Sequence, residues 1–351
     1  MFFAFHHAAL FEQKHWPRGF SVNGMIQIEG QKMSKSRNVF VTWRHALEQY
    51  GADGLRATLA LAADGMDDAD WKAKNADDIS TKIDSLFSFI EKGLAGASER
   101  ERERSDRWLL SVVHGRIEVV TKSLEEMKIR KGISVALLDV WNDIRWYLRR
   151  TEEPRYATLK TVFETWIRLV APFIPFAAEE INKRLGNKGL IATADWPSTV
   201  DFPHDESAEL SELLVAKVIE DGRNLLHIIK EQKKRLTIYV ASDLATDFFL
   251  EVAKADKKGT ARGEVMRKYG SSGIKPEGIM KLQHELGEEL VARLAALGDL
   301  DEFAVLNEAA SFLSKELGIE VRVFKAGEKR TEDPANKSKG ALPFKPSFYL
   351  E

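Results

Sequence analysis

The sequence of 351 residues contains no cysteine. This absence excludes disulfide bonds, thiolate zinc sites, iron–sulfur clusters and a cysteine nucleophile within these residues. It also gives no support for an oxidising compartment, so we expect a cytoplasmic protein. Long apolar runs are absent as well. The longest, residues 167–178, contains Arg168 and two prolines and is shorter than the ~20 residues that a membrane span needs.

The sequence also lacks a strong charge of one sign. The formal net charge is −2, from 52 Lys and Arg against 54 Asp and Glu. This balance argues against a uniformly basic nucleic-acid binder and leaves room for a local basic patch. Hydrophobic residues make up 44% of the chain, which excludes full disorder. At ~150 residues per domain, the length predicts two or three domains.

The first residues, Met1 to His7, have neither a basic n-region nor a long h-region, so a signal peptide is not indicated. Phe2, Phe3 and Phe5 form an apolar segment with no capping or turn residue before it. We therefore expect the chain to enter a fold that begins elsewhere.

Residues 1–72 have a mixed α/β pattern. Strand-like runs on both sides of Asn23-Gly24 predict a β-hairpin that turns at this dipeptide. Glu29-Gly30 is expected to begin a polar loop. Thr42 then opens a helix that stops at Gly51, and a second helix follows from Asp53 to Ala63.

The rest of the chain divides into a helical part and a mixed part. Residues 73–234 show apolar stripes at helical spacing, which predict a helix bundle. Residues 235–351 predict a small α+β domain with strands at 236–240 and 319–324, followed by an extended or loop tail. Helices are expected near residues 244–254, 260–268, 276–297 and 301–317. The fold class is therefore mainly α with an α/β start.

One short motif carries recognisable chemistry. Lys32-Met33-Ser34-Lys35-Ser36 lies in the polar loop before Thr42. Two ammonium groups three residues apart suit a triphosphate, because they stabilise the charge that develops when phosphate bonds change. The serine hydroxyls add hydrogen bonds. From these residues alone, a solvated surface loop remains the simpler interpretation.

The pentapeptide is identical to the KMSKS motif of class I aminoacyl-tRNA synthetases, and its flanks resemble the C-terminal part of the archaeal and eukaryotic leucyl-tRNA synthetases. The resemblance is strongest in residues 1–71 and weakest in residues 235–325. It rests on Phe5–Phe11, His15-Trp16-Pro17, Asn23-Gly24, Phe40, Thr42, Ala46-Leu47, Tyr50–Asp53, Leu55-Arg56, Asp67–Trp71, Pro172-Phe173, Pro175, Glu179-Glu180, Asp333-Pro334, Lys345-Pro346 and Tyr349.

The resemblance implies a role for each residue of the motif, which we call the KMSKS loop (residues 32–36). Lys32 and Lys35 would hold the phosphates of ATP, with Lys35 the foremost candidate. Ser34 and Ser36 would shape the loop around Met33. Gly24 and Met25 would approach the adenine, although a plain hairpin turn explains them equally well.

Two departures from the family pattern stand out near the loop. Asn38 occupies a position that is usually Gly, and Asn tolerates the left-handed conformation better than other non-glycine residues. Val39 replaces a polar side chain. A third departure, further along, is Phe176, where the family often has His.

The resemblance also implies how the chain is organised. Residues 1–72 would be the C-terminal part of a Rossmann catalytic domain, residues 73–234 an anticodon-binding-like bundle, and residues 235–351 a tRNA-binding domain. No HIGH-type motif, first Rossmann half or editing domain is found in the sequence. We therefore expect a separate N-terminal polypeptide that carries them.

Basic residues indicate where RNA would bind. Phosphate contacts from them would give salt-dependent affinity. One cluster lies before the first predicted strand of the C-terminal domain and the other in the tail: Lys233, Lys234 and Arg235, and Lys329, Arg330, Lys337 and Lys339.

The implied function is that of a leucine–tRNA ligase fragment or subunit that works with leucine, ATP and tRNA(Leu). Mg²⁺ would accompany ATP, and we expect no metal held by the protein and no membrane partner. Two alternatives stay open. One is a non-catalytic tRNA-binding protein derived from a synthetase. The other is an isoleucyl, valyl or methionyl relative.

Overall fold

The computed structural model describes residues 2–20, 22–229, 234–255, 260–270, 274–298, 300–328 and 333–351. The chain forms two compact units, and each is made of two stretches of sequence. The first unit comprises Met1–Arg102 and Val112–Pro203, and the second comprises Glu103–Ser111 and His204–Glu351. Among the described residues, no helix combines the length and the apolar character needed to cross a membrane. The division into three domains at residues 72 and 234 stays a prediction.

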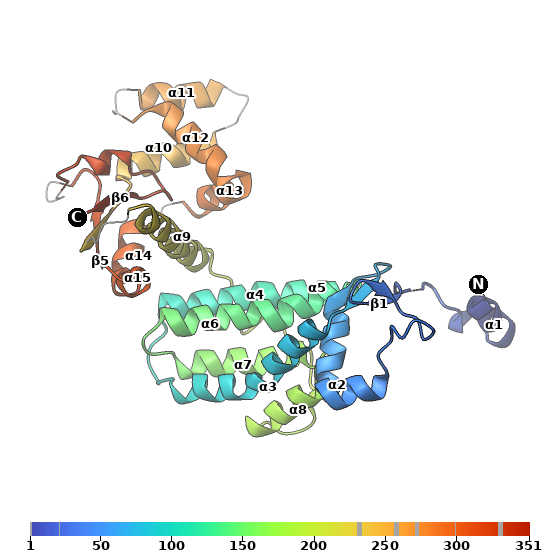
Figure 1. Ribbon diagram of the computed structural model, residues 1–351. Coiled ribbons are helices and arrows are strands. Elements are labelled where there is room, and N and C mark those ends of the chain that lie inside the picture. The colour runs from blue at the N-terminus through green and yellow to red at the C-terminus, as the bar shows by residue number, and fades with distance from the viewer. Residues whose placement is uncertain are drawn as a thin grey trace. The chain divides into compact units, whose positions relative to one another are not determined.

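The first unit begins with helix α1 (Phe2–Leu10) and a 3-10 turn, η1 (Gln13–His15), and then enters a small sheet (Figure 1). Strand β1 (Ile26–Ile28) lies between β2 (Gln31–Lys32) and β3 (Ala69–Trp71). The β1–β2 pair is antiparallel and the β1–β3 pair is parallel.

The hairpin in this sheet does not turn where the sequence predicts. Its turn is Glu29-Gly30, with φ of 48° and 73°, as a two-residue turn of type I′ requires. The prediction of a turn at Asn23-Gly24 is therefore wrong. Gly24 instead donates its backbone N–H to the carbonyl of Gly65, at 3.2 Å. This distant contact takes the place of a local turn.

Helix α2 (Trp43–Ala62) follows the KMSKS loop. Its start is confirmed, because the Thr42 side chain caps it by accepting a hydrogen bond from the backbone N–H of His45. The predicted break is confirmed as well. Gly51 has a φ of 68° and kinks the helix, which leaves two helical segments joined at this residue.

Helices form the rest of the first unit, as predicted, and Figure 1 shows α3, α4, α6 and α7 side by side. The segments are α3 (Ala73–Ala95), α4 (Arg104–Glu125), α5 (Ile129–Ile133), the π-helical segment η2 (Ser134–Asp139), α6 (Val140–Arg150), α7 (Tyr156–Val170), α8 (Pro175–Arg184) and the 3-10 turn η3 (Ile191–Thr193). The first residues of α4 belong to the second unit.

The core of the bundle is aromatic. Trp166 and Phe163 are fully buried, and Phe89 stacks on Trp141 with ring centroids 4.5 Å apart. The buried indole N–H of Trp166 donates to the carbonyl of Ala136, at 2.7 Å. Ala136 lies in the π-helical segment, where the widened backbone frees carbonyls from the regular α-helical pattern. The irregular segment therefore satisfies a buried donor.

Two side chains of α2 hold the break between α7 and α8. The buried carboxylate of Asp53 accepts hydrogen bonds from the backbone N–H groups of Ala177 and Phe176, at 2.6 and 3.4 Å. These amides belong to the first turn of α8, where a carboxylate also complements the helix dipole. On the other side, Arg56 donates to the carbonyls of Pro172 and Phe173, at 2.8 and 3.2 Å. Phe176 itself is exposed.

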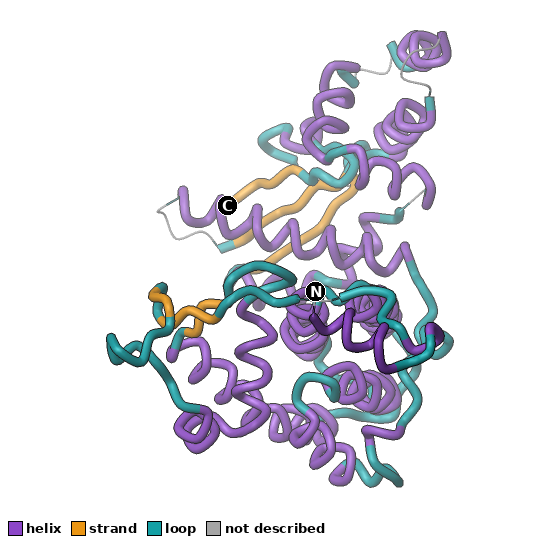
Figure 2. The backbone as a smooth tube through the Cα atoms, turned by 90° about the vertical axis from the view of Figure 1, so that its right-hand side faces the viewer, coloured by secondary structure: helices purple, strands orange, loops and turns teal. Residues whose placement is uncertain are grey.

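The second unit is built on a three-stranded sheet, whose strands lie side by side in Figure 2. The central strand β4 (Arg235–Val240) pairs in parallel with β5 (Glu320–Lys325) and antiparallel with β6 (Ser347–Leu350). The two predicted strands are confirmed. The tail, which was expected to be extended or a loop, also contains the 3-10 turn η4 (Lys337–Gly340) and ends in β6.

The second unit also contains seven helices among its described residues. They are α9 (Glu206–Ile228), α10 (Asp243–Lys254), α11 (Thr260–Lys268), α12 (Pro276–Leu286), α13 (Glu288–Leu297), α14 (Glu302–Glu308) and α15 (Ala310–Leu317). Of these, α14 and α15 contact β5. The single helix predicted over residues 276–297 is divided at Gly287, which has a φ of 81°. The one predicted over residues 301–317 is divided at Ala309.

The hydrogen bonds that Asp53 accepts from the start of α8 predict a loss of stability when this carboxylate is removed. We expect Asp53→Ala to lower the free energy of unfolding by about 2 kcal/mol, because the backbone amides of Phe176 and Ala177 in the first turn of α8 lose their acceptor. Asp53→Asn keeps one acceptor oxygen and should lose less. Urea denaturation followed by circular dichroism measures both.

The matched control is Asp78→Ala, because Asp78 is an exposed carboxylate on α3. We expect a change within about 0.5 kcal/mol for this surface substitution. Equal losses in the free energy of unfolding for Asp53→Ala and Asp78→Ala would show that the hydrogen bonds of Asp53 with α8 contribute nothing specific to stability.

Candidate functional site

The KMSKS loop is the turn of a miniature hairpin. Ser34 and Val39 exchange two backbone hydrogen bonds, at 2.7 and 2.9 Å, and the backbone N–H of Asn38 donates to the carbonyl of Lys35 at 3.1 Å. Asn38 has a φ of 57°, the left-handed conformation in which its replacement of Gly is tolerated. The hydroxyls of Ser34 and Ser36 lie 3.1 Å apart and hydrogen-bond. The altered sequence therefore still closes the loop.

A pocket of about 1010 Å³ lies beside this hairpin and collects most of the predicted site residues. Gly24 and Met25 approach from one segment, and Met33, Ser34 and Lys35 from the loop. Lys32 ends strand β2 and is exposed, and neither it nor Ser36 lines the pocket. The remaining lining residues are Ile26, Ile28, Phe40, Val41, Thr42, Trp43, Ala46, Leu55, Leu59 and Trp71.

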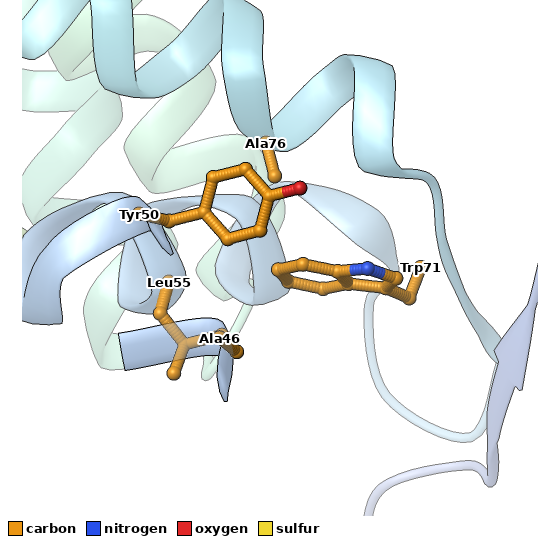
Figure 3. Close-up of a cluster of buried hydrophobic side chains, with 5 residues drawn as sticks. All are labelled: Ala46, Tyr50, Leu55, Trp71 and Ala76. Atoms are coloured by element: carbon orange, nitrogen blue, oxygen red, sulfur yellow. The ribbon is translucent and has the colours of Figure 1, made fainter. Parts of the chain in front are cut away.

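The pocket has an apolar floor. Ala46, Leu55 and Trp71 belong to a buried cluster with Tyr50 and Ala76, in which the rings of Tyr50 and Trp71 meet edge to face at 5.6 Å (Figure 3). Burial, with the negative charge of Asp77, raises the pKa of the Tyr50 hydroxyl above its ordinary value. An apolar floor with a cationic residue at the edge suits a ligand that is planar at one end and anionic at the other.

Carboxylates of the segment after α2 fix the wall of the pocket. Asp68 accepts hydrogen bonds from the backbone N–H of Met25 at 2.8 Å and from the side-chain amide of Gln27 at 3.2 Å. Asp70 accepts from the backbone N–H of Gly30, also at 2.8 Å. The sequence showed this acidic block but not its role. The available signal was the spacing of Asp68 and Asp70, one just before β3 and one within it, because side chains two residues apart in an extended segment share one face.

The predicted RNA-binding residues of the second unit have different environments. Lys233, Lys329 and Arg330 lie outside the described residues. Arg235 forms ion pairs with Glu320 and Glu351, at 3.1 and 2.8 Å, so its charge is already matched. Lys234 is exposed.

Lys337 and Lys339 lie on the exposed turn η4. Asp333 holds this turn by accepting hydrogen bonds from the backbone N–H groups of Lys337 and Ser338, at 2.7 and 2.8 Å. The turn therefore presents two ammonium groups from a fixed backbone.

Comparison with known proteins covers the whole chain. The family described as tRNA synthetases class I (M) matches residues 1–87, and the family described as anticodon-binding domain of tRNA ligase matches residues 106–241. The leucine–tRNA ligase of Pyrococcus abyssi is 33% identical over 362 aligned residues, and that of Methanosarcina acetivorans is 35% identical over 369. Both alignments cover 100% of this chain, which spans only 36% and 38% of the lengths of these relatives.

A solved structure has a similar fold. The agnB2 LeuRS of Agrobacterium radiobacter K84, in its ternary LeuRS–tRNA–LeuAMS complex, aligns with a TM-score of 0.50 at 17% identity. The alignment covers 76% of this chain and 32% of that one.

The wall of the pocket predicts the effect of a substitution at Gly24. A Cβ at this position would lie 2.2 Å from the carbonyl oxygen of Asp67, a backbone atom that has no freedom to rotate away. We expect Gly24→Ala to push the segment around Gly24 away from the segment around Asp67. Amide hydrogen exchange at Met25 and Ala69 should then be about tenfold faster, which corresponds to a loss of about 1.4 kcal/mol in the free energy of local opening. Exchange read by mass spectrometry checks this.

Gly19→Ala is the control, because a Cβ at Gly19 has no atom within 4 Å. Exchange at Met25 and Ala69 should be unchanged in this variant. Unchanged exchange in Gly24→Ala as well would contradict the close approach at Asp67.

Proposed function

Since the whole chain aligns with leucine–tRNA ligases at 33–35% identity, we propose that it belongs to this family and supplies the KMSKS loop and the tRNA-binding parts of a leucine–tRNA ligase. The reaction joins leucine and ATP into leucyl-adenylate with release of pyrophosphate. The leucyl group is then transferred to the terminal 2′-hydroxyl of tRNA(Leu). Residues 1–72 act as the second half of a Rossmann-type catalytic domain.

The observation that supports this proposal best is the pocket beside the KMSKS loop. Residues separated in sequence, Gly24 and Met25 on one side and Ser34 and Lys35 on the other, line one cavity. The adenine ring lies against the apolar floor, and the phosphates extend toward Lys35. This arrangement matches the two ends of ATP to the two kinds of lining.

The lysines contribute electrostatic stabilisation. As the carboxylate of leucine attacks the α-phosphorus, the bond to the departing pyrophosphate breaks and negative charge builds on its oxygens. The ammonium of Lys35, with that of Lys32 when the loop closes, stabilises this charge more than it stabilises bound ATP, and the barrier falls. The hydrogen bond between Ser34 and Ser36 limits the conformations that the loop must search.

Mg²⁺ accompanies ATP in this proposal and supplies additional charge neutralisation on the phosphates. Among the described residues, no group of three or more His, Asp or Glu side chains is arranged to hold a metal ion. We therefore assign no residue of the chain to Mg²⁺ and derive no step through it.

The helical and C-terminal parts position tRNA(Leu). Residues 106–241 match an anticodon-binding family, and the exposed lysines of η4 offer phosphate contacts in the second unit. These contacts bring the acceptor end of the tRNA to the adenylate.

The 351 residues contain no HIGH-type motif, so they hold only part of the active site. The nucleotide site of a doubly wound sheet lies where its two halves meet. We propose that the HIGH half and the editing domain come from polypeptide outside these residues, and that the chain alone does not activate leucine.

The direct test is leucine-dependent ATP–pyrophosphate exchange, measured for the chain alone and with a polypeptide that carries the HIGH half. We expect exchange only in the mixture. Lys35→Ala in the mixture should lower the exchange rate about 100-fold, because it removes a charge that acts mainly in the transition state.

Lys14→Ala serves as the control, because Lys14 is an exposed lysine of the same unit outside the pocket. Its exchange rate should equal that of the wild type. Full exchange in Lys35→Ala would exclude the catalytic role of the loop. Binding of tRNA(Leu) with no exchange in any mixture would favour a non-catalytic tRNA-binding protein.

The turn η4 gives a second prediction. The double substitution Lys337→Gln and Lys339→Gln should weaken tRNA(Leu) binding more at low salt than at high salt. It should also reduce the slope of log affinity against log salt concentration by about two, because each lysine neutralises about one phosphate. Fluorescence anisotropy over a salt series measures this.

The double substitution Lys275→Gln and Lys315→Gln is matched in charge and places the changes on other exposed positions of the same unit. Equal salt slopes for the two double variants would refute a specific role of η4.

A further inference from the structure

A small pocket lies on the surface of the bundle, apart from the KMSKS loop. Its volume is about 450 Å³, within the ~300–1,000 Å³ typical of small-molecule sites. It is lined by Phe89 of α3 and by Asn142, Arg145, Trp146, Leu148 and Arg149 of α6.

Four of these residues share one face of α6. Asn142, Arg145, Trp146 and Arg149 recur at the spacing i, i+3, i+4 and i+7, which aligns side chains along a helix. The opposite face holds Val140, Trp141, Ile144 and Tyr147, which are all buried. Packing in the core therefore explains the apolar side of α6. The side that lines the pocket is polar, aromatic and basic.

Lys82 of α3 does not line the pocket, but its positive charge lies near that of Arg145, which does. Burial and the positive charge of nearby Arg145 lower the pKa of Lys82, whose ammonium lies 4.4 Å from the centre of the Trp141 ring. Among the described residues, no carboxylate lies within ion-pair distance of Lys82 or Arg145. The acidic residue of α6, Asp143, is instead engaged by Arg116 of α4, at 2.8 Å. A pair of neighbouring cations without a carboxylate creates an attraction for an anion.

The aromatic part of the pocket is prepared for stacking. The guanidinium of Arg149 lies over the ring of Trp146, 4.9 Å from its centre. Nucleobases stack on both indole rings and guanidinium planes. Asn142 adds an exposed side-chain amide that both donates and accepts hydrogen bonds, which suits the edge of a base.

We propose that this pocket binds one single-stranded nucleotide of RNA. The base stacks on Trp146 and Arg149, Asn142 meets its edge, and Arg145 with Lys82 attracts the phosphate. The inference rests on the proposed function, because tRNA is then the RNA at hand, but it assigns a particular nucleotide site. A duplex does not fit, because its bases are already stacked on one another.

The test uses the full chain and two fluorescent probes, a ten-residue oligouridylate and an RNA duplex of equal length, together with tRNA(Leu). We expect Trp146→Ala to raise the Kd for oligouridylate about tenfold, while Trp146→Phe, which keeps an aromatic ring, changes it less than about threefold. Arg145→Gln should lower the salt slope by about one. Binding of the duplex should be unchanged in all three variants.

Lys160→Gln on α7 is the matched control, because Lys160 is an exposed cation of the same bundle outside the pocket. It should leave the Kd for oligouridylate at the wild-type value. Circular dichroism checks folding. If Trp146→Ala does not fold, Arg145→Gln and Trp146→Phe decide the outcome through the salt slope and the duplex control.

The outcomes separate this inference from the proposed function. Equal binding of oligouridylate and tRNA(Leu) by wild type and the pocket variants would overturn the nucleotide site and leave the proposed function standing. Competition by an acidic peptide as effective as that by unlabelled oligouridylate would also overturn it, in favour of a protein partner. Failure to exchange pyrophosphate in any mixture, with binding that still depends on Trp146, would overturn the proposed function alone.

Discussion

The carboxylate of Asp53 and the guanidinium of Arg56 hold the break between α7 and α8 from its two sides. The negative group meets free amides at the start of one helix, and the positive group meets carbonyls beyond the end of the other. Both side chains leave α2 within one turn, so a short piece of helix fixes the bundle against the segment that follows the KMSKS loop. The pocket wall, the loop and the bundle all depend on the position of this helix.

The candidate site combines a rigid frame with a small adjustable element. Carboxylates of Asp68 and Asp70 tie the strand beside the pocket to the segment after α2, and the aromatic cluster of Tyr50 and Trp71 closes the floor. The KMSKS loop, in contrast, is closed by a few backbone hydrogen bonds and is largely exposed. A frame of this kind keeps a ligand in register while the loop moves over it.

Sequence reasoning succeeded where the signal is local. Apolar periodicity predicted the helices of the bundle, Thr42 and Gly51 marked the cap and the kink of α2, and β-branched residues marked β4. It failed where distant segments decide. Asn23-Gly24 has the composition of a hairpin turn, yet a contact with Gly65 determines its conformation.

The same limit applies to the site. The motif revealed the loop, and Asn38 was expected to tolerate its conformation. The partners of Asp53 lie more than 120 positions away in sequence, so no local pattern announces them. The pocket is likewise assembled by tertiary contact, and its apolar lining residues, such as Leu59 and Val41, look like ordinary core residues in the sequence.

The pairing order of the second sheet has a consequence for folding during synthesis. Strand β4 is made before both of its neighbours, which are residues 320–325 on one edge and residues 347–350 on the other. The ribosome must therefore release more than a hundred further residues before β4 gains both partners. High contact order of this kind slows folding and leaves an apolar strand exposed meanwhile, so the nascent unit has a window in which chaperones or aggregation compete with the native sheet.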